Sequence, residues 1–364
     1  MKKYELDINF EMEKYLHSNE MAGAALIVSK FTDEVYRNKW GYADIEGKTP
    51  TQYDTIYRLA SMTKPITAVA IMQLIEQGKL KLEDPISKFL NEYEKPEVSA
   101  LTVRDLLSHS SGMGMGPVGL EFANKSIDKN DNLEIRVRKW SKMPLDFQPG
   151  TETGYSPLVG FDILGRLTEV ISGMDYQEYL RSKIFQPMGI KDITFQLSEE
   201  QHTRAAKLYS SENNKHVLIP EGDSLWQEVN PGFAGYFSGA AGLSGSVEDY
   251  HKFTSMLANN GEWKGVRILA PETVYTMQKR GAANILDSSP GSYWGLGMRV
   301  FKQPELDNLK VAPGTYGWSG AYGTHMFIHP ASGLSATFVM NRTNIGGAGS
   351  PIARKVEELV FGIL

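Results

Sequence analysis

The first sixty residues show two different spacings of apolar side chains. Apolar residues in 7–17 recur every three or four positions, which predicts an amphipathic helix. The runs 22–29 and 34–42 flank a turn at 31–33, which predicts a pair of strands. The chain is therefore expected to begin with a helix followed by a strand pair.

The middle of the chain is predicted to be mostly helical. Three apolar runs have helical length and spacing: 66–75, 158–171 and 176–185. Gly78 and Gly173 follow the first two runs, and glycine is common just after a helix ends. Thr102, with Asp105 three residues later, predicts the start of a short helix through His109.

The stretch 110–150 differs from its neighbours. Glycines come first, then a charged run at 125–142, then Pro149-Gly150. A connection of this length is uncommon in a compact domain unless it has a role of its own. We expect a long excursion, partly helical at 134–140, that roofs a cleft.

The last third of the chain is predicted to be rich in strands. Apolar or alternating runs predict three strands and a closing helix: 293–301, 323–329, 334–341 and 351–361. Strands at both ends with helices between them predict a mixed α/β (α+β) fold, with an antiparallel sheet built from both termini, flanked by helices, and a mostly helical insertion. We divide the chain into a discontinuous sheet domain, 1–60 plus 220–364, and a helical domain, 61–219, with the active site in the cleft between them.

Composition narrows the classes of function. The chain has 364 residues, a net charge of −5 and no cysteine, which excludes disulfides, thiolate chemistry and cysteine-ligated zinc. The sequence has no basic patch of the kind that binds nucleic acid, so we expect no nucleic-acid partner. Residues 1–10 lack the apolar core of a signal peptide and no run is long enough to span a membrane, so we expect a cytoplasmic protein. The oligomeric state stays open.

Ser61-Met62-Thr63-Lys64 is the main candidate for chemistry. It precedes the apolar run 66–75, so Ser61 and Lys64 lie one helical turn apart on the same face. Ser61 also lies at the positive end of the helix dipole, which favours negative charge on its oxygen. A nearby lysine can take the hydroxyl proton, which is the arrangement of a serine acyl-transfer nucleophile. The same spacing at Ser126 and Lys129 has no apolar face and is taken as accidental.

Two further segments complete the candidate site. Tyr155 lies on a loop just before a predicted helix, and a tyrosine near a lysine can act as general base and then as general acid. The alternative is a half-buried tyrosine that only packs. Gly317-Trp318-Ser319-Gly320-Ala321 precedes a predicted strand, and an exposed amide there can polarise an acyl carbonyl. Taken alone, this segment is more often a turn.

In this order and with these flanks, the three segments resemble the serine β-lactamase and penicillin-binding protein superfamily. The similarity is greatest to its class C-like branch, which includes family VIII carboxylesterases and related acyltransferases. It extends over roughly 22–361 and includes the segments 101–112, 149–156, 239–249 and 294–297. The resemblance implies Ser61 as nucleophile, Lys64 as its activating partner and Tyr155 as second acid/base. It also implies an oxyanion hole of the Ser61 and Ala321 amides, and substrate contacts from Trp318, Ser319 and Gly320.

Two departures from the family pattern bear on the substrate. Penicillin-recognising members carry a Lys-Thr-Gly triplet whose cation holds a carboxylate, whereas this chain has Trp318-Ser319-Gly320. They also place an asparagine two residues after the tyrosine, where this chain has Pro157. An indole in place of a cation favours an apolar or aromatic group over an anion. The resemblance therefore implies a carboxylesterase or acyltransferase acting on a small ester, with no cofactor.

Other readings and signals carry less weight. A β-lactamase or D,D-peptidase acting on a lactam or peptide is the second hypothesis, and a catalytically silent binding protein on the same scaffold is the third. The string 114–119 matches a dinucleotide fingerprint but follows a helix instead of a strand. No Gly-x-Ser-x-Gly elbow occurs. His109 is assigned a structural role, His325 and His329 lack a metal-site context, and Arg342 is taken as a solvated strand end.

Overall fold

A large antiparallel sheet forms the base of the molecule. The computed structural model describes residues 2–126, 128, 130–220, 236–282, 289–345 and 349–363. The sheet has eight strands in the order β10-β11-β12-β13-β14-β1-β2-β3. Their bounds are β1 Gly23–Lys30, β2 Asp33–Asp44, β3 Thr49–Pro50, β10 Ser292–Trp294, β11 Arg299–Phe301, β12 Tyr316–Ser319, β13 His325–His329 and β14 Leu334–Met340. β1 pairs with β14, so the predicted sheet from both ends of the chain is confirmed.

Helices cover both faces of this sheet. α1 (Lys3–His17) and α12 (Pro351–Phe361) lie together on one face, where Leu26 of β1 and Phe338 of β14 join their apolar side chains. α10 (Val247–Ala258) packs on the opposite face, against Ala25 of β1 and Val339 of β14. Successive side chains of a strand point to opposite faces, so β1 and β14 contribute to both cores.

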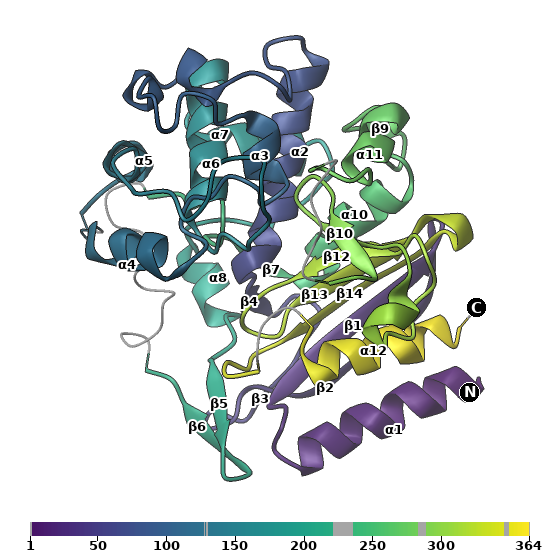
Figure 1. Cartoon of the computed structure of the whole chain (residues 1–364). Helices are drawn as coiled ribbons and strands as arrows, with labels where there is room; N and C mark the ends of the chain where they lie inside the picture. The colour runs from purple at the N-terminus through teal and green to yellow at the C-terminus, as the bar shows by residue number, and fades with distance from the viewer. Residues whose placement is uncertain are drawn as a thin grey trace.

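The remaining helices gather beside the sheet (Figure 1). Their bounds are α2 Thr63–Glu76, α3 Val103–Leu107, α4 Pro117–Ser126, α5 Leu133–Trp140, α6 Val159–Ser172, α7 Tyr176–Leu180, α8 Glu199–Thr203 and α11 Pro271–Met277. Three short strand pairs lie among them: β4 Ile56–Arg58 with β7 Ser244–Ser246, β5 Tyr209–Glu212 with β6 Lys215–Leu218, and β8 Glu262–Trp263 with β9 Val266–Arg267. Nearly every side chain of α2 is buried, because α6 and α7 pack around it.

Two predicted elements are wrong in detail. The single strand at 293–301 is a hairpin of β10 and β11, because the chain reverses at 295–298. Gly297 has φ +83° there and lies so close to α2 that a Cβ would be 2.5 Å from the Cβ of Ala68. The short helix begins at Thr102 as predicted but ends at Leu107, since His109 has φ +54° and leaves the helical path.

None of the helices in the described ranges combines the length and the apolar character that a membrane span requires. The cytoplasmic location stays a prediction.

Candidate active site

Ser61 lies at a strained junction between a strand and a helix. β4 ends at Arg58, Ala60 has φ +47°, and a 3₁₀ turn at Ala60–Met62 leads into α2. A left-handed conformation in a residue with a Cβ costs on the order of 1–3 kcal/mol and needs support from its surroundings. Here Ala60 is buried against Leu208 and Tyr322. The junction places the Ser61 hydroxyl at the start of α2, as the sequence predicted.

Lys64 is fully buried one turn further along α2. Its Nζ lies 3.3 Å from the Oγ of Ser61. Nζ also donates to two backbone carbonyls, those of Pro157 at 2.8 Å and Ala240 at 3.0 Å. These three oxygen atoms surround Nζ and fix the direction of the side chain.

Tyr155 completes the group of three side chains. Its hydroxyl donates to the Oγ of Ser61 at 2.6 Å, and Nζ of Lys64 lies 5.0 Å from the centroid of its ring. The structure therefore brings together the hydroxyl, the amine and the phenol, although Tyr155 is 94 residues from Ser61 in the chain. Such a group can pass a proton between the serine oxygen and either partner.

His109 holds the loop that carries Tyr155. Its Nδ1 accepts from the amide of Ser156 at 3.1 Å, and its carbonyl accepts from the amide of Gly154 at 2.9 Å. These bonds fix the residues on both sides of Tyr155. Burial, and then the nearby charges of Lys64 and Arg299, hold the pKa of His109 well below its usual value, so the ring is neutral. The positive φ of His109 aims its carbonyl and ring at this loop.

The 318–321 segment lies beside Ser61 at the end of β12. The ring of Trp318 lies 5.2 Å from that of Tyr155. Gly320 is in close contact with the chain before Ser61, since a Cβ there would lie 2.2 Å from the carbonyl oxygen of Leu59. Within the described part of the chain, the amide of Ala321 makes no hydrogen bond. It is therefore available to an oxygen atom bound next to Ser61.

The side chain of Ser319 points away from the candidate site. Its side chain is buried on the other side of β12, where Oγ lies 2.7 Å from Nδ1 of His325. Nε2 of His325 lies 3.1 Å from Glu357 of α12. Because neighbouring residues of a strand point to opposite faces, Trp318 faces the site and Ser319 cannot offer its hydroxyl to a substrate. The role of Ser319 in substrate binding stays a prediction, and the part of this residue that lies at the site is its backbone.

Two cavities meet the site from different sides. One, of about 190 Å³, is mostly apolar and is lined by Ser61, Leu120, Val159 and Ala321 among others. Leu120 belongs to α4, so the excursion at 110–150 does form part of the wall over the site.

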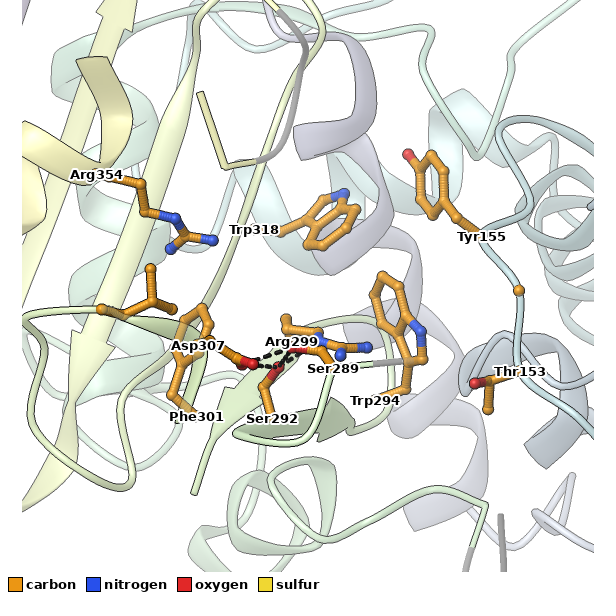
Figure 2. A pocket seen from close by; sticks show the side chains of 12 residues that line it. Thr153, Tyr155, Ser289, Ser292, Trp294, Arg299, Phe301, Asp307, Trp318 and Arg354 are labelled. Atoms are coloured by element: carbon orange, nitrogen blue, oxygen red, sulfur yellow. Dashed lines mark hydrogen bonds between the residues drawn. The ribbon is translucent and has the colours of Figure 1, made fainter. Parts of the chain in front are cut away.

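The second cavity, of about 430 Å³, lies beyond Tyr155 and Trp318 (Figure 2). It has aromatic walls and two guanidinium groups, those of Arg299 and Arg354. Asp307 also lines it and accepts from Ser289 and Ser292. Arg354 is bonded to Glu357, and Arg299 donates to Ser292, so these charges are engaged with neighbours.

Several residues around the site were not predicted from the sequence. Trp294 was noted only as part of a segment, yet its ring lies 4.2 Å from that of His109 and 4.7 Å from that of Trp318. Asp162 has a sequence signal of its own, since a carboxylate inside an apolar helical run indicates a specific buried contact. Arg342, taken from the sequence as a solvated strand end, is half-buried and donates to the carbonyl of Glu20.

Comparisons with known proteins agree with this geometry. The sequence model of the family described as Beta-lactamase matches residues 11–360. Esterase EstB of Burkholderia gladioli is 29% identical over 377 residues, covering 96% of this chain and 93% of the relative. A putative D-alanyl-D-alanine carboxypeptidase of Salmonella agona is 28% identical over 371 residues, covering 92% and 81%. The solved structure of EstCE1, a hydrolase with promiscuous acyltransferase activity, has a TM-score of 0.81 at 25% identity and covers 96% of each chain. Since the family match spans nearly the whole sequence, this chain belongs to the β-lactamase family.

Proposed function

We propose that this protein is a serine hydrolase, a carboxylesterase that forms an acyl-enzyme on Ser61. The observation that carries the proposal is the pair of contacts to one oxygen: Lys64 at 3.3 Å and Tyr155 at 2.6 Å from the Oγ of Ser61. A serine held by two groups that can exchange a proton is the arrangement that nucleophilic catalysis needs. The similarity to an esterase over almost the full chain supports the same activity.

The reaction proceeds in two half-reactions. The proton of Ser61 passes to Lys64, acting as a free amine, or to Tyr155, acting as a phenolate, as Oγ bonds to the carbonyl carbon of the ester. The amides of Ser61 and Ala321 donate to the developing oxyanion, which stabilises the transition state more than the substrate. Tyr155 gives a proton to the leaving alkoxide as the ester bond breaks. Water then attacks the acyl-enzyme, one of its protons passes through Tyr155 or Lys64 to the Oγ of Ser61 as the bond to the acyl carbon breaks, and a carboxylic acid is released.

The two cavities divide the substrate between them. The apolar cavity of about 190 Å³ beside Ser61 receives the acyl group, and the larger cavity beyond Trp318 receives the leaving alcohol. An indole where relatives place a cation favours an apolar or aromatic alcohol. An alcohol bound there after acylation is also positioned to accept the acyl group, so the site supports acyl transfer. We place this site in the cleft between a sheet domain, 1–60 plus 220–364, and a helical domain, 61–219.

A β-lactamase or D,D-peptidase is the second candidate, favoured by the similarity to the Salmonella carboxypeptidase. Two observations favour the esterase over it. Pro157 offers Lys64 a backbone carbonyl and has no side-chain amide for a lactam or peptide. Trp318 also replaces the cation that holds a carboxylate in penicillin-recognising relatives. A scaffold that only binds is disfavoured, since all three reactive side chains are retained and in contact.

The test compares two substrates on one enzyme. We expect p-nitrophenyl butyrate to acylate the wild type faster than a chromogenic cephalosporin, and Ser61→Ala to abolish turnover of both. Faster acylation by the cephalosporin would reverse the ranking of esterase and β-lactamase. Full ester turnover by Ser61→Ala would refute the nucleophile.

A further inference from the structure

Asp162 is a fully buried carboxylate that the proposed mechanism does not use. It lies in the first turn of α6, with no exposed surface. Burial raises the pKa of Asp162, while hydrogen bonds from Tyr236, Ser238 and the amide of Ala240 oppose that shift. Burying a carboxylate costs folding free energy unless its oxygens accept hydrogen bonds. The donors around Asp162 therefore indicate its role.

Those partners all belong to the segment 236–240. Tyr236 and Ser238 donate their hydroxyls to the carboxylate, Ser238 at 2.7 Å, and the amide of Ala240 donates at 3.1 Å. Asp162 thus accepts three hydrogen bonds from five consecutive residues. Carboxylate hydrogen bonds of this kind are stronger than bonds between neutral groups.

The same segment supplies an acceptor for Lys64. The carbonyl of Ala240 accepts from Nζ of Lys64 at 3.0 Å, and the carbonyl of the preceding Gly239 accepts from Thr67 of α2. Gly239 also packs closely against α6: a Cβ at this position would lie 2.4 Å from the carbonyl oxygen of Phe161. The segment is therefore held between α2 and α6, with Asp162 fixing it on the α6 side.

We infer that Asp162 is a positioning residue for Lys64. It holds the Ala240 peptide by its amide, and the carbonyl of Ala240 directs the ammonium of Lys64 toward Ser61. Through this chain of contacts Asp162 and the carbonyl of Pro157 together set the direction of Lys64. This inference rests on the proposed role of Lys64 in activating Ser61.

Three variants test the inference by kinetics with p-nitrophenyl butyrate and by the rate at which a fluorophosphonate labels Ser61. Asp162→Ala removes the carboxylate that accepts from the Ala240 amide and leaves that amide only the hydroxyl of Ser238 at 3.2 Å, so we expect kcat and the labelling rate to fall about 10- to 100-fold with KM changed less than about threefold. Asp162→Asn can still accept from Ser238 and Ala240 through its amide oxygen, so we expect it to stay within about threefold of the wild type. Ser238→Ala removes one of the three bonds to Asp162 and also the hydroxyl that accepts from the Ala240 amide at 3.2 Å, but it keeps the carboxylate and is the milder variant if Asp162→Ala does not fold.

Asp249→Ala is the matched control. Asp249 is also a buried carboxylate and accepts from two backbone amides, those of Lys191 at 2.7 Å and Asp192 at 2.6 Å, but it makes no bond to the site. We expect this control to lose stability in urea unfolding while kcat stays near that of the wild type.

A wild-type kcat in folded Asp162→Ala and Ser238→Ala would overturn the positioning role but not the proposed function. A loss of kcat in Asp162→Asn as large as that in Asp162→Ala would do the same. An equal loss of kcat in Asp249→Ala would also overturn it, since the effect would then follow stability. A wild-type enzyme that neither cleaves the ester nor reacts with the phosphonate would instead refute the proposed function, and the inference with it.

Discussion

The contact between Gly320 and the chain before Ser61 makes Gly320→Ala an informative variant. A Cβ at this position would lie 2.2 Å from the carbonyl oxygen of Leu59 and 2.2 Å from Oγ1 of Thr324. Since real Cβ contacts below 3.0 Å are essentially never seen, one side must move by about 0.8 Å (3.0 − 2.2). Leu59 is buried beside Ser61, so we expect the end of β12, with the next residue Ala321, to move away from the nucleophile.

The expected loss of kcat follows from displacing the Ala321 amide, a proposed donor to the oxyanion. A misplacement of this size, or the loss of one oxyanion-hole donor, lowers kcat by about 10²- to 10³-fold. Overpacking a buried site costs about 1–3 kcal/mol of the free energy of unfolding. We therefore expect Gly320→Ala to fold with reduced stability and to lose about 10²-fold in kcat for p-nitrophenyl butyrate, with KM changed much less.

Gly160→Ala is the control for this experiment. It makes the same chemical change in α6, near Tyr155, but its Cβ would be in ordinary contact, 3.5 Å from Oγ of Ser156. Gly160 is the second residue of α6, where its Cβ meets no close contact, so this variant is expected to keep the stability and the activity of the wild type. If folded Gly320→Ala keeps a wild-type kcat, the Ala321 amide does not hold the oxyanion and this part of the account is refuted.

Three other predictions concern separate parts of the molecule. Tyr155→Phe keeps the ring contacts but removes the hydroxyl 2.6 Å from Ser61, so kcat is expected to fall about 10²- to 10⁴-fold; a wild-type burst of p-nitrophenol would exclude an acid/base role. Trp318→Lys is expected to raise the ratio of cephalosporin to ester acylation, and an unchanged ratio would remove Trp318 as the determinant of substrate class. Burial, and then the charge of Arg37, lower the pKa of His251 from 6.5 to about 3, so the neutral ring stabilises the fold above pH 6.5 and this stability is lost as pH falls toward 3. At pH 5, 1.5 units below 6.5, the loss is roughly 2 kcal/mol, and urea unfolding of His251→Gln should show a flatter pH dependence than the wild type.

Much of this site could be predicted because its signals are local. Ser61 and Lys64 share the start of α2, so their spacing alone places them on one face. The role of Tyr155 could be predicted only through the family resemblance. Nothing in the sequence between Ser61 and Tyr155 specifies that the loop carrying Tyr155 returns to α2. Strand alternation, applied to 318–321, separates the side chain of Trp318 from that of Ser319, whereas the family motif on its own does not distinguish them.

The features that the sequence does not predict depend on contacts made by backbone atoms. Lys64 is oriented by the carbonyls of Pro157 and Ala240, and carbonyls leave no signature in a sequence. The hairpin of β10 and β11 was missed for a similar reason. Its turn depends on the close contact between Gly297 and α2, which appears only once the chain is folded.

The most direct test of the central claim is to find which residue a covalent probe modifies. A fluorophosphonate should bond through phosphorus to the Oγ of Ser61, with loss of fluoride, and mass spectrometry of the digested protein should locate the adduct on the peptide that contains Ser61. We expect one adduct per chain at Ser61, formed much more slowly in Lys64→Met. An adduct on another serine, or the same labelling rate without the lysine, would contradict the central claim.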